Sequence, residues 1–498
     1  MNTLRATALL IAVFLLLPAA ALAGQEGPEA AGEVLELSVE EVALLALQNN
    51  RDLRVQRLNP VIAGTFEQIE RGAFDTELFA EAQYAEERAS EIARSTGTQF
   101  AVEGSDTAAV AGVRRFLPTG TTLEGSVEQS RSISNRAPEQ QLARVGLSVT
   151  QALLRGFGPA VNLVAVRQAE LGTVASRYQL RGFTEALLAE AEIAYWNFVL
   201  AREQIAIFES SLAVSRQQRD EIELRIEVGL LPEVEAAAAR AEVARREQAL
   251  ITARSLLEER RLRLLRLLNP APEDGYEQRI TATTEPRMKA EPVRDLAERL
   301  QLAEKMRPDL NEARLLLQQQ RLETVATRNG LLPRLDFFIT LGKTGYADSF
   351  SGSFRELDGN TYDLQTGLRL SHFIGNREAE ARHLAAKTSR QQAQESLDNL
   401  RQLVRLDVRL ALNELERARQ QIAASAVTRA LQEETLAAEK ERFEVGASTA
   451  LLVSQAQRDL LASQIVEVEA IVNYRTALVN LYLAEGSLLE RRGILLGS

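Results

Sequence analysis

The sequence predicts a mixed, mainly α fold in which long α-helical hairpins are duplicated and each half of the chain also carries a β-hairpin. Three observations predict it. Long stretches lack helix breakers, short motifs recur at one fixed offset, and segments of alternating apolar and polar residues precede the helical stretches in both halves. With 498 residues, the chain is long enough for two such repeats.

The longest breaker-free stretch is residues 376–445, which contain neither Pro nor Gly. A stretch of this length predicts one continuous helix of roughly 100 Å, at about 1.5 Å per residue. Residues 160–228 resemble it, with Gly172 and Gly182 as weak points. In the longer stretch, apolar residues recur at steps of three and four, which predicts a narrow seam against partner helices. These residues are Leu397, Leu400, Val404, Val408, Ala411, Leu415, Ala418 and Ile422.

An internal repeat is indicated by two separate matches at the same offset. RIEVG at 225–229 recurs as RFEVG at 442–446, and AREQI at 201–205 recurs as ARQQI at 418–422. We therefore place a first repeat at 37–268 and a second at 293–498. Residues 269–292, which carry four prolines, are expected to be the linker between them.

Strands are predicted ahead of the long helices. Residues 334–341 and 362–373 alternate apolar and polar side chains around a Gly/Ser/Asp-rich connector, which favours a hairpin within 334–373. Residues 76–84 and 143–151 alternate likewise. An extra segment at about 85–142 separates them, and its Leu-Pro-Thr-Gly-Thr turn at 117–121 is compatible with an extra hairpin. Such strands suit either an outer-membrane barrel or the half-buried sheet of a soluble domain.

The N-terminus predicts export. Residues 1–23 combine one basic residue, an apolar run and an Ala-Leu-Ala end, as a secretory signal peptide does, although a retained anchor helix is the alternative. Residues 24–36 form an acidic lead that we expect to be flexible. No later run reaches the ~18 apolar residues of a membrane-spanning helix, so a membrane crossing would require a barrel.

Composition excludes several classes of function. The chain has no Cys, which excludes disulfides, thiol catalysis and thiolate metal sites. A net charge of -11 argues against nucleic acid as the main partner. His372 and His383 are too isolated to indicate a metal site, and no nucleophile–base arrangement is recognisable. We therefore expect neither enzymatic activity nor a cofactor.

The order of these segments resembles the TolC family of outer-membrane efflux and secretion channels. The resemblance rests on residues 37–53, 150–158, 194–205 and above all 442–461, RFEVGASTALLVSQAQRDLL, and it covers about 37–488. It implies a homotrimer in the outer membrane that extends into the periplasm. Each chain would add four strands to a shared transmembrane β-barrel, and the helices would form an α-barrel tunnel.

The resemblance also implies partners and a function. A periplasmic adaptor (membrane fusion) protein would connect the channel to an inner-membrane pump or ABC transporter, and outer-membrane lipid would surround the barrel. Small molecules or proteins would leave passively, by efflux or type I secretion. The alternative is an exported periplasmic coiled-coil scaffold without a pore.

Site residues follow from the same resemblance. The two helix turns would form the periplasmic tip that contacts the adaptor; the alternative is that each Gly only ends its helix. The tunnel constriction would fall at Leu452 and Gln455, where some relatives carry acidic residues, so a carboxylate ring is not expected there. Relatives often carry Pro where Ala152 and His372 stand, so the bends are expected at Gly156, Gly158 and Gly375. The expected adaptor contacts are Arg225, Val228, Gly229, Arg442, Val445 and Gly446.

Overall fold

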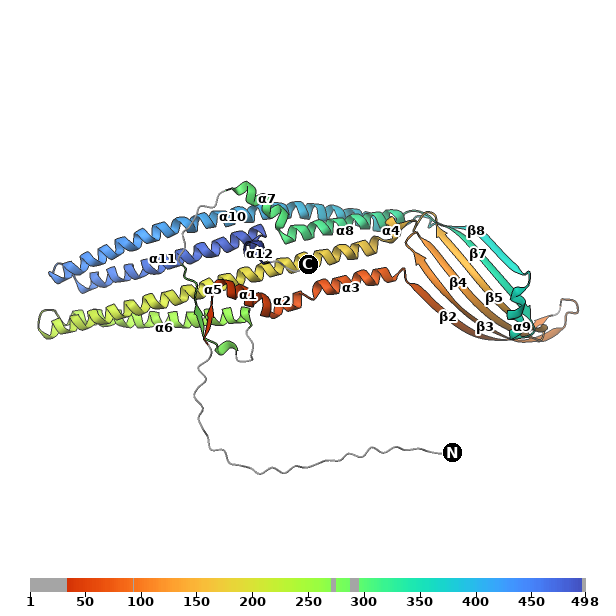
Figure 1. Ribbon diagram of the computed structural model, residues 1–498, viewed down its shortest axis with the longest axis horizontal. Coiled ribbons are helices and arrows are strands. Elements are labelled where there is room, and N and C mark those ends of the chain that lie inside the picture. Colours follow the sequence, from red (N-terminus) through yellow and green to blue (C-terminus); the bar gives the residue numbers. More distant parts are fainter. Residues whose placement is uncertain (1–33, 93, 270–274, 287–294, 495–498) are drawn as a thin grey trace, which may run out of the picture.

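The computed structural model describes residues 34–92, 94–269, 275–286 and 295–494. The molecule is elongated, with a β-sheet at one end and the turns of two helical hairpins at the other (Figure 1). The predicted signal peptide at 1–23 lies outside the described residues, as do most of the acidic lead and parts of the linker. No helix in the described ranges has the length and apolarity needed to span a membrane.

The first half of the chain runs from short helices into four strands and then into a helical hairpin. The order begins with a short strand and three helices: β1 (Leu35–Leu37), α1 (Val39–Asn49), α2 (Arg51–Gln56) and α3 (Asn59–Gly72). The four strands follow as β2 (Thr76–Ile92), β3 (Gln99–Leu117), β4 (Thr121–Ser134) and β5 (Ala137–Ala152). The half ends with α4 (Pro159–Asn162), α5 (Val164–Glu227) and α6 (Val234–Leu268).

The second half repeats this order with two strands instead of four. It begins with η1 (Gly275–Glu277), β6 (Ile280–Ala282), α7 (Leu296–Met306) and α8 (Pro308–Gly330). The strand β7 (Arg334–Ala347), the short helices α9 (Phe350–Arg355) and η2 (Glu356–Asp358), and β8 (Tyr362–Ser371) follow. It ends with α10 (Arg377–Glu444), α11 (Ala450–Glu485) and α12 (Leu488–Arg491).

The long helices are continuous, as predicted. The helix α10 has 68 residues and α5 has 64, and neither Gly172 nor Gly182 interrupts α5. Between the sheet and the middle of the molecule the helices pack in the order α3, α5, α8, α10. The predicted seam of α10 is buried or half-buried against α7, α8 and α11. Burial of this seam, at about 25 cal/mol per Å² of apolar surface, is what holds such long helices together.

A second buried cluster ties the two halves together at mid-length. Strand β1 pairs in parallel with β6, so the expected lead and linker each contribute a strand. Tyr195 is fully buried, and its hydroxyl accepts a hydrogen bond from the Thr284 amide and donates one to the Leu37 carbonyl. Trp196 packs edge-on against Tyr195, as expected of a residue buried between helices.

The sheet has six strands in the order β2-β3-β4-β5-β7-β8, all antiparallel. The prediction of four strands was therefore wrong in number. The turn at 117–121 was placed correctly, but the extra segment forms β3, β4 and the outer parts of β2 and β5. Its small Ala, Gly, Ser and Thr residues obscure the period-two pattern, so pairing with neighbouring strands decides what the sequence leaves ambiguous.

A buried carboxylate lies in α5 near the C-terminal helix. Glu185 is 1% exposed, and burial raises its pKa to about 7, although the Arg181 guanidinium lies 3.1 Å away and favours the charged form. Because the folded protein binds this proton more tightly than the unfolded chain, the carboxyl stabilises the fold fully below about pH 4.5. That contribution is lost as the pH rises through about 7.

We therefore expect Glu185→Gln to flatten the dependence of stability on pH. Between about pH 5 and pH 8 the variant should lose less stability than the wild type, by on the order of 1–3 kcal/mol. Thermal unfolding of the purified protein at the two pH values measures this. Glu190→Gln, on an exposed turn of the same helix, is the matched control, and equal slopes for all three proteins would contradict the assignment.

Candidate functional site

The six-stranded sheet has one apolar face. Residues paired across antiparallel strands share a face, so the register connects Leu78, Val113 and Gly125 and continues to Leu147 and beyond. The large apolar side chains on this face are solvent-exposed in the single chain. They are Leu78, Val113, Leu123, Val127, Val145, Leu147, Phe337, Leu341, Leu364, Leu368 and Leu370. An exposed apolar surface spanning six strands requires lipid or protein to cover it.

The apolar band has the height of a membrane core. Strand β8 has 10 residues, the length of a tilted membrane-spanning strand. Tyr84 and Tyr362 are exposed on the same face toward the end distant from the helices, as interfacial aromatic residues are. Beyond the apolar band, β2 and β3 continue as a longer polar pair to Ile92 and Gln99. This pair projects past the outer rim.

The opposite face of the sheet is polar and rich in carboxylates. Ion pairs join neighbouring strands or strand residues on it at Arg114–Glu124 (2.8 Å), Arg144–Asp363 (2.6 Å) and, within β7, Arg334–Asp336 (2.8 Å). Carboxylates outnumber guanidinium groups on this face. The carboxylates are Glu77, Glu81, Glu87, Glu91, Asp106, Glu124, Glu128, Asp336 and Asp363; the guanidinium groups are Arg114, Arg144, Arg334 and Arg369.

Two aromatic–glycine contacts repeat on the polar face. The Phe79 ring lies over Gly112 with the Arg114 guanidinium 5.0 Å from its centroid. In the second half, Phe338 lies over Gly367 with Arg369 at 5.5 Å. Each ring covers the backbone of a glycine on the neighbouring strand, where a Cβ would collide with it. Sequence analysis missed this repeat because the partners are paired through the register and are distant in sequence.

Glycines make the bends where strands meet helices. Gly156, Gly158 and Gly375 have φ of 85°, 87° and 94°, a region that favours glycine. The expectation that the bends fall at these three glycines is confirmed. Asn376 also has positive φ and donates its side-chain amide to the Leu331 carbonyl.

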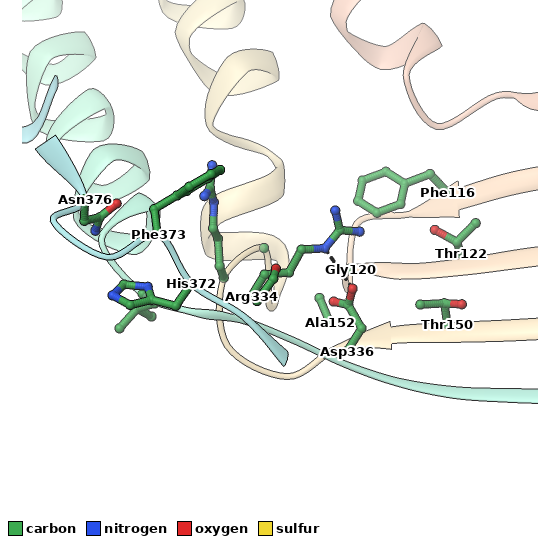
Figure 2. Close-up of a pocket in the computed structure, with 14 residues that line it drawn as sticks. Phe116, Gly120, Thr122, Thr150, Ala152, Arg334, Asp336, His372, Phe373 and Asn376 are labelled. Atoms are coloured by element: carbon green, nitrogen blue, oxygen red, sulfur yellow. Dashed lines mark hydrogen bonds and ion pairs between the residues drawn. The ribbon is translucent and has the colours of Figure 1, made fainter. Parts of the chain in front are cut away.

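A cavity of about 510 Å³ lies at this junction, on the polar side of the sheet (Figure 2). The Arg334 guanidinium donates to the Asp336 carboxylate within it, and Asp336 is 3% exposed. His372 lines the cavity, whereas His383 lies on α10 with its Nδ1 3.2 Å from the Thr327 hydroxyl. Among the described residues no group of His, Cys, Asp and Glu is arranged to hold a metal ion. The cavity therefore lies where the strands of the sheet meet the helical part of the molecule.

The repeated Arg-x-Glu-Val-Gly motifs close helices α5 and α10 in the same way. The Gly229 amide donates to the Ile226 carbonyl at 2.9 Å, and the Leu230 amide donates to the Arg225 carbonyl at 2.8 Å. Gly446 and Ala447 make the equivalent bonds to Phe443 and Arg442, at 3.1 and 2.8 Å. This pattern is a Schellman motif, with Gly in the left-handed conformation, φ 78° and 77°.

The structure brings the two turns together. The Arg225 guanidinium lies 5.6 Å from the centroid of the Phe443 ring, so the first turn contacts the second. Val228 and Val445 are 61% and 80% exposed at the extreme end, and Arg442 is held by Glu439 at 3.0 Å. A Cβ on Gly229 or Gly446 would meet no atom within 4 Å. Within the chain, these glycines are therefore required by φ and not by packing.

Leu452 and Gln455 lie on the exposed side of the first turns of α11. They begin a stripe with steps of three and four that the described part of the chain leaves exposed. Sequence reasoning missed its continuation to Asp459, a carboxylate seven residues after Leu452 on the same side, although the spacing alone could have indicated it. The stripe consists of Leu452, Gln455, Asp459, Ala462 and Val466.

Comparisons with known proteins agree with this geometry. Residues 299–487 match the family described as "Outer membrane efflux protein". Outer membrane efflux protein BepC of Brucella suis is 26% identical over 352 residues, covering 70% of this chain and 73% of BepC.

Solved structures share the fold. The Campylobacter jejuni CmeC outer membrane channel matches with a TM-score of 0.67 and 17% identity, over 90% of this chain and 86% of CmeC. A membrane protein from Pseudomonas aeruginosa matches with a TM-score of 0.67 and 21% identity, over 90% and 93%. The predicted mixed, mainly α fold with long helices and a sheet, the resemblance to the TolC family and the outer-membrane location are confirmed, whereas the predicted number of strands is not. A pore-free scaffold is not favoured.

We expect a charge on the apolar face to block membrane insertion. Leu147→Arg, on the central strand β5, should cost about 2–4 kcal/mol and remove the protein from the outer-membrane fraction. The neighbouring Ser148→Arg points to the polar face and should insert normally. Fractionation of cells that express each variant measures this, and equal insertion of both variants would contradict the assignment of faces.

Proposed function

We propose that this chain, an outer-membrane channel of the outer membrane efflux protein family, works as a homotrimer that gives small molecules or proteins passive exit from a tripartite efflux pump or type I secretion system. The observation that best supports this proposal is a sheet with one exposed apolar face and one polar face. The strands of this sheet continue into the long helices, which we call the helical shaft. The family description and BepC favour efflux. Secretion uses the same architecture. The energy would come from the inner-membrane partner.

The homotrimer is supported by two free strand edges. Strands β2 and β8 end the sheet on opposite sides, and each has a row of backbone groups without a strand partner in the single chain. In lipid such groups must be paired, since each unpaired group costs several kcal/mol. Because the strand number is even, β8 of one copy meets β2 of the next in antiparallel orientation. Copies joined this way form a ring, and the resemblance to the TolC family favours a ring of three copies.

The helical edges support the same interface. On α3, Ile62, Phe66 and Ile69 form a stripe that is more than half exposed. On α10, at the opposite edge of the helical layer, Leu403, Leu406 and Leu410 are about half exposed at steps of three and four. Both stripes have coiled-coil spacing, and neither is covered by another of the residues that the structure describes. Packing α10 of one copy on α3 of the next would bury both, in continuity with the β8–β2 pairing.

The two turns at the helical tip suit an adaptor. Each exposes apolar side chains next to a glycine that leaves open space, so a partner backbone can approach closely. Leu230, Val234 and Leu451 extend this exposed apolar surface. A periplasmic adaptor is the proposed partner at the tip, and Leu452 and Gln455 are the proposed constriction.

We expect Phe66→Glu to prevent trimer formation. The new carboxylate would be buried against α10 of the neighbouring copy, which should weaken association by several kcal/mol. Size-exclusion chromatography in detergent measures the oligomer. Gln68→Glu, exposed on the same helix outside the stripe, is the matched control and should remain trimeric. A trimeric Phe66→Glu protein would exclude α3 from the interface.

We expect Gly446→Trp to abolish export while leaving the trimer intact. The indole would fill the open space that the adaptor backbone is proposed to approach. Gly446→Ala is the control, since it carries the same left-handed strain of about 1–2 kcal/mol without the bulk. Export is measured as substrate retention in cells that express each variant at equal trimer levels. Normal export by Gly446→Trp trimers would exclude the second turn as a docking site.

A further inference from the structure

Strands β3 and β4 enlarge the sheet without enlarging the helical part. The strands β2, β5, β7 and β8 each continue into a helix at one end. In contrast, β3 and β4 are joined to each other on the helical side by the turn at 118–120, and to β2 and β5 at the outer rim. The two added strands therefore change the circumference of whatever the sheet encloses, while the helical shaft keeps its size.

Strands β3 and β4 are hydrogen-bonded members of the sheet. The register runs unbroken from β2 to β3 and from β3 to β4, and a single bulge at Ser132/Ser134 interrupts β4 against β5. Their turn is fixed to the first helix junction. The Ala152 amide donates to the Gly120 carbonyl at 3.0 Å, and the Asn162 side chain donates to the Pro118 carbonyl at 3.0 Å.

Close packing at the turn leaves no room for a side chain at Gly120. A Cβ on Gly120 would lie 2.3 Å from the Gly156 carbonyl oxygen, so the turn backbone touches the strand-to-helix bend directly. Gly120 has φ 85°, which a side chain would strain further. The β3–β4 pair is thus held in line with the other strands at its inner end.

The added strands and the adjoining β2 also contribute carboxylates without ion pairs to the polar face. Among the described residues, Glu81 on β2, Asp106 on β3 and Glu128 on β4 lie on this face and make no ion pair. Glu81, Val110 and Glu128 occupy one row across the three strands. Since the apolar face must meet lipid, the polar face with these carboxylates lines the enclosed space.

We propose that β3 and β4 make the exit pore wide and cation-selective, so that it passes bulky cationic solutes. This rests on the homotrimer proposed above. Three six-stranded sheets close into a barrel of eighteen strands, whereas sheets without β3 and β4 would close with twelve. Barrel diameter grows roughly linearly with strand number, so the pore is about 1.5 times as wide. Carboxylates facing inward raise the local concentration of cations.

The width of the pore is tested with reagents added outside the cell. These reagents enter through the outer end of the barrel and do not have to pass the proposed constriction at the periplasmic end. Because the chain has no Cys, Ser148→Cys on the polar face of β5 gives a single thiol inside the pore. Polyethylene glycol maleimides of increasing mass are added to intact cells. Labelling should extend to clearly larger polymers in the full chain than in a variant that lacks residues 99–134, in which β2 and β5 pair directly. Equal mass limits in two assembled trimers would overturn the proposal.

A second experiment tests the proposal on the full-length protein, so that the test does not depend on assembly of the deletion variant. Electron cryo-microscopy of the full-length trimer counts the strands in cross-section. Eighteen strands support the proposal, and a closed twelve-stranded barrel with β3 and β4 outside it overturns it. Absence of a trimer would instead overturn the proposed homotrimer, and detergent chromatography of the same preparation detects that separately.

Charge selection is tested with the same thiol. After each rate is divided by the rate of the same reagent with a free thiol in solution, a trimethylammonium-bearing methanethiosulfonate should modify Ser148→Cys roughly tenfold faster than a sulfonate-bearing reagent of similar size. Adding Glu81→Gln and Glu128→Gln should reduce this ratio several-fold, and added salt should reduce it further. Glu103→Gln, on the other face of β3, is the matched control and should leave the ratio unchanged. A normalised rate ratio near one in Ser148→Cys without the Glu→Gln substitutions would overturn cation selection.

Discussion

The unpaired edges of β2 and β8 are the constraint on which the rest of the structure depends. A sheet with an exposed apolar face is stable in lipid, but lipid cannot hydrogen-bond to its edge strands. In the single chain, lipid can therefore cover the apolar face of the sheet, but the backbone hydrogen bonds at its two edge strands remain incomplete. Because β2 continues from α3 and β8 continues into α10, the same two edges extend into the helical shaft, where apolar stripes also lack partners. One head-to-tail interface would satisfy both parts at once.

The helical shaft explains why the chain is duplicated. Each half supplies one long hairpin, and each hairpin must reverse at the same distance from the membrane. The Schellman motifs at Gly229 and Gly446 achieve this with matching backbone hydrogen bonds. At mid-length the Tyr195 hydroxyl bonds to backbone on both β1 and the segment after β6, which joins the start of one repeat to the start of the next. The two repeats are thus connected at the middle of the helical shaft, and their helices reverse direction at its tip.

The candidate site was predicted in part. The residues proposed as adaptor contacts lie at the two helix turns, since the motif and its repetition specify helix ends, and helix termination is a local property. Their contact with each other, Arg225 over Phe443, depends on how two hairpins lie side by side. The continuation to Asp459 and the Phe–Gly–Arg contacts of the polar face were missed, because they depend on helix exposure and strand register.

The sequence by itself determined the long helices, their glycine reversals, the bends at Gly156, Gly158 and Gly375, and the four strands that adjoin helices. These follow from local steric rules and from strong periodicity. Only the tertiary structure decided the number of strands and the two faces of the sheet. Strand β3 is rich in Ala and Gly, and Gly112 is compatible with either face until Phe79 of the neighbouring strand covers it. A weak period-two signal becomes definite only when neighbouring strands fix the register.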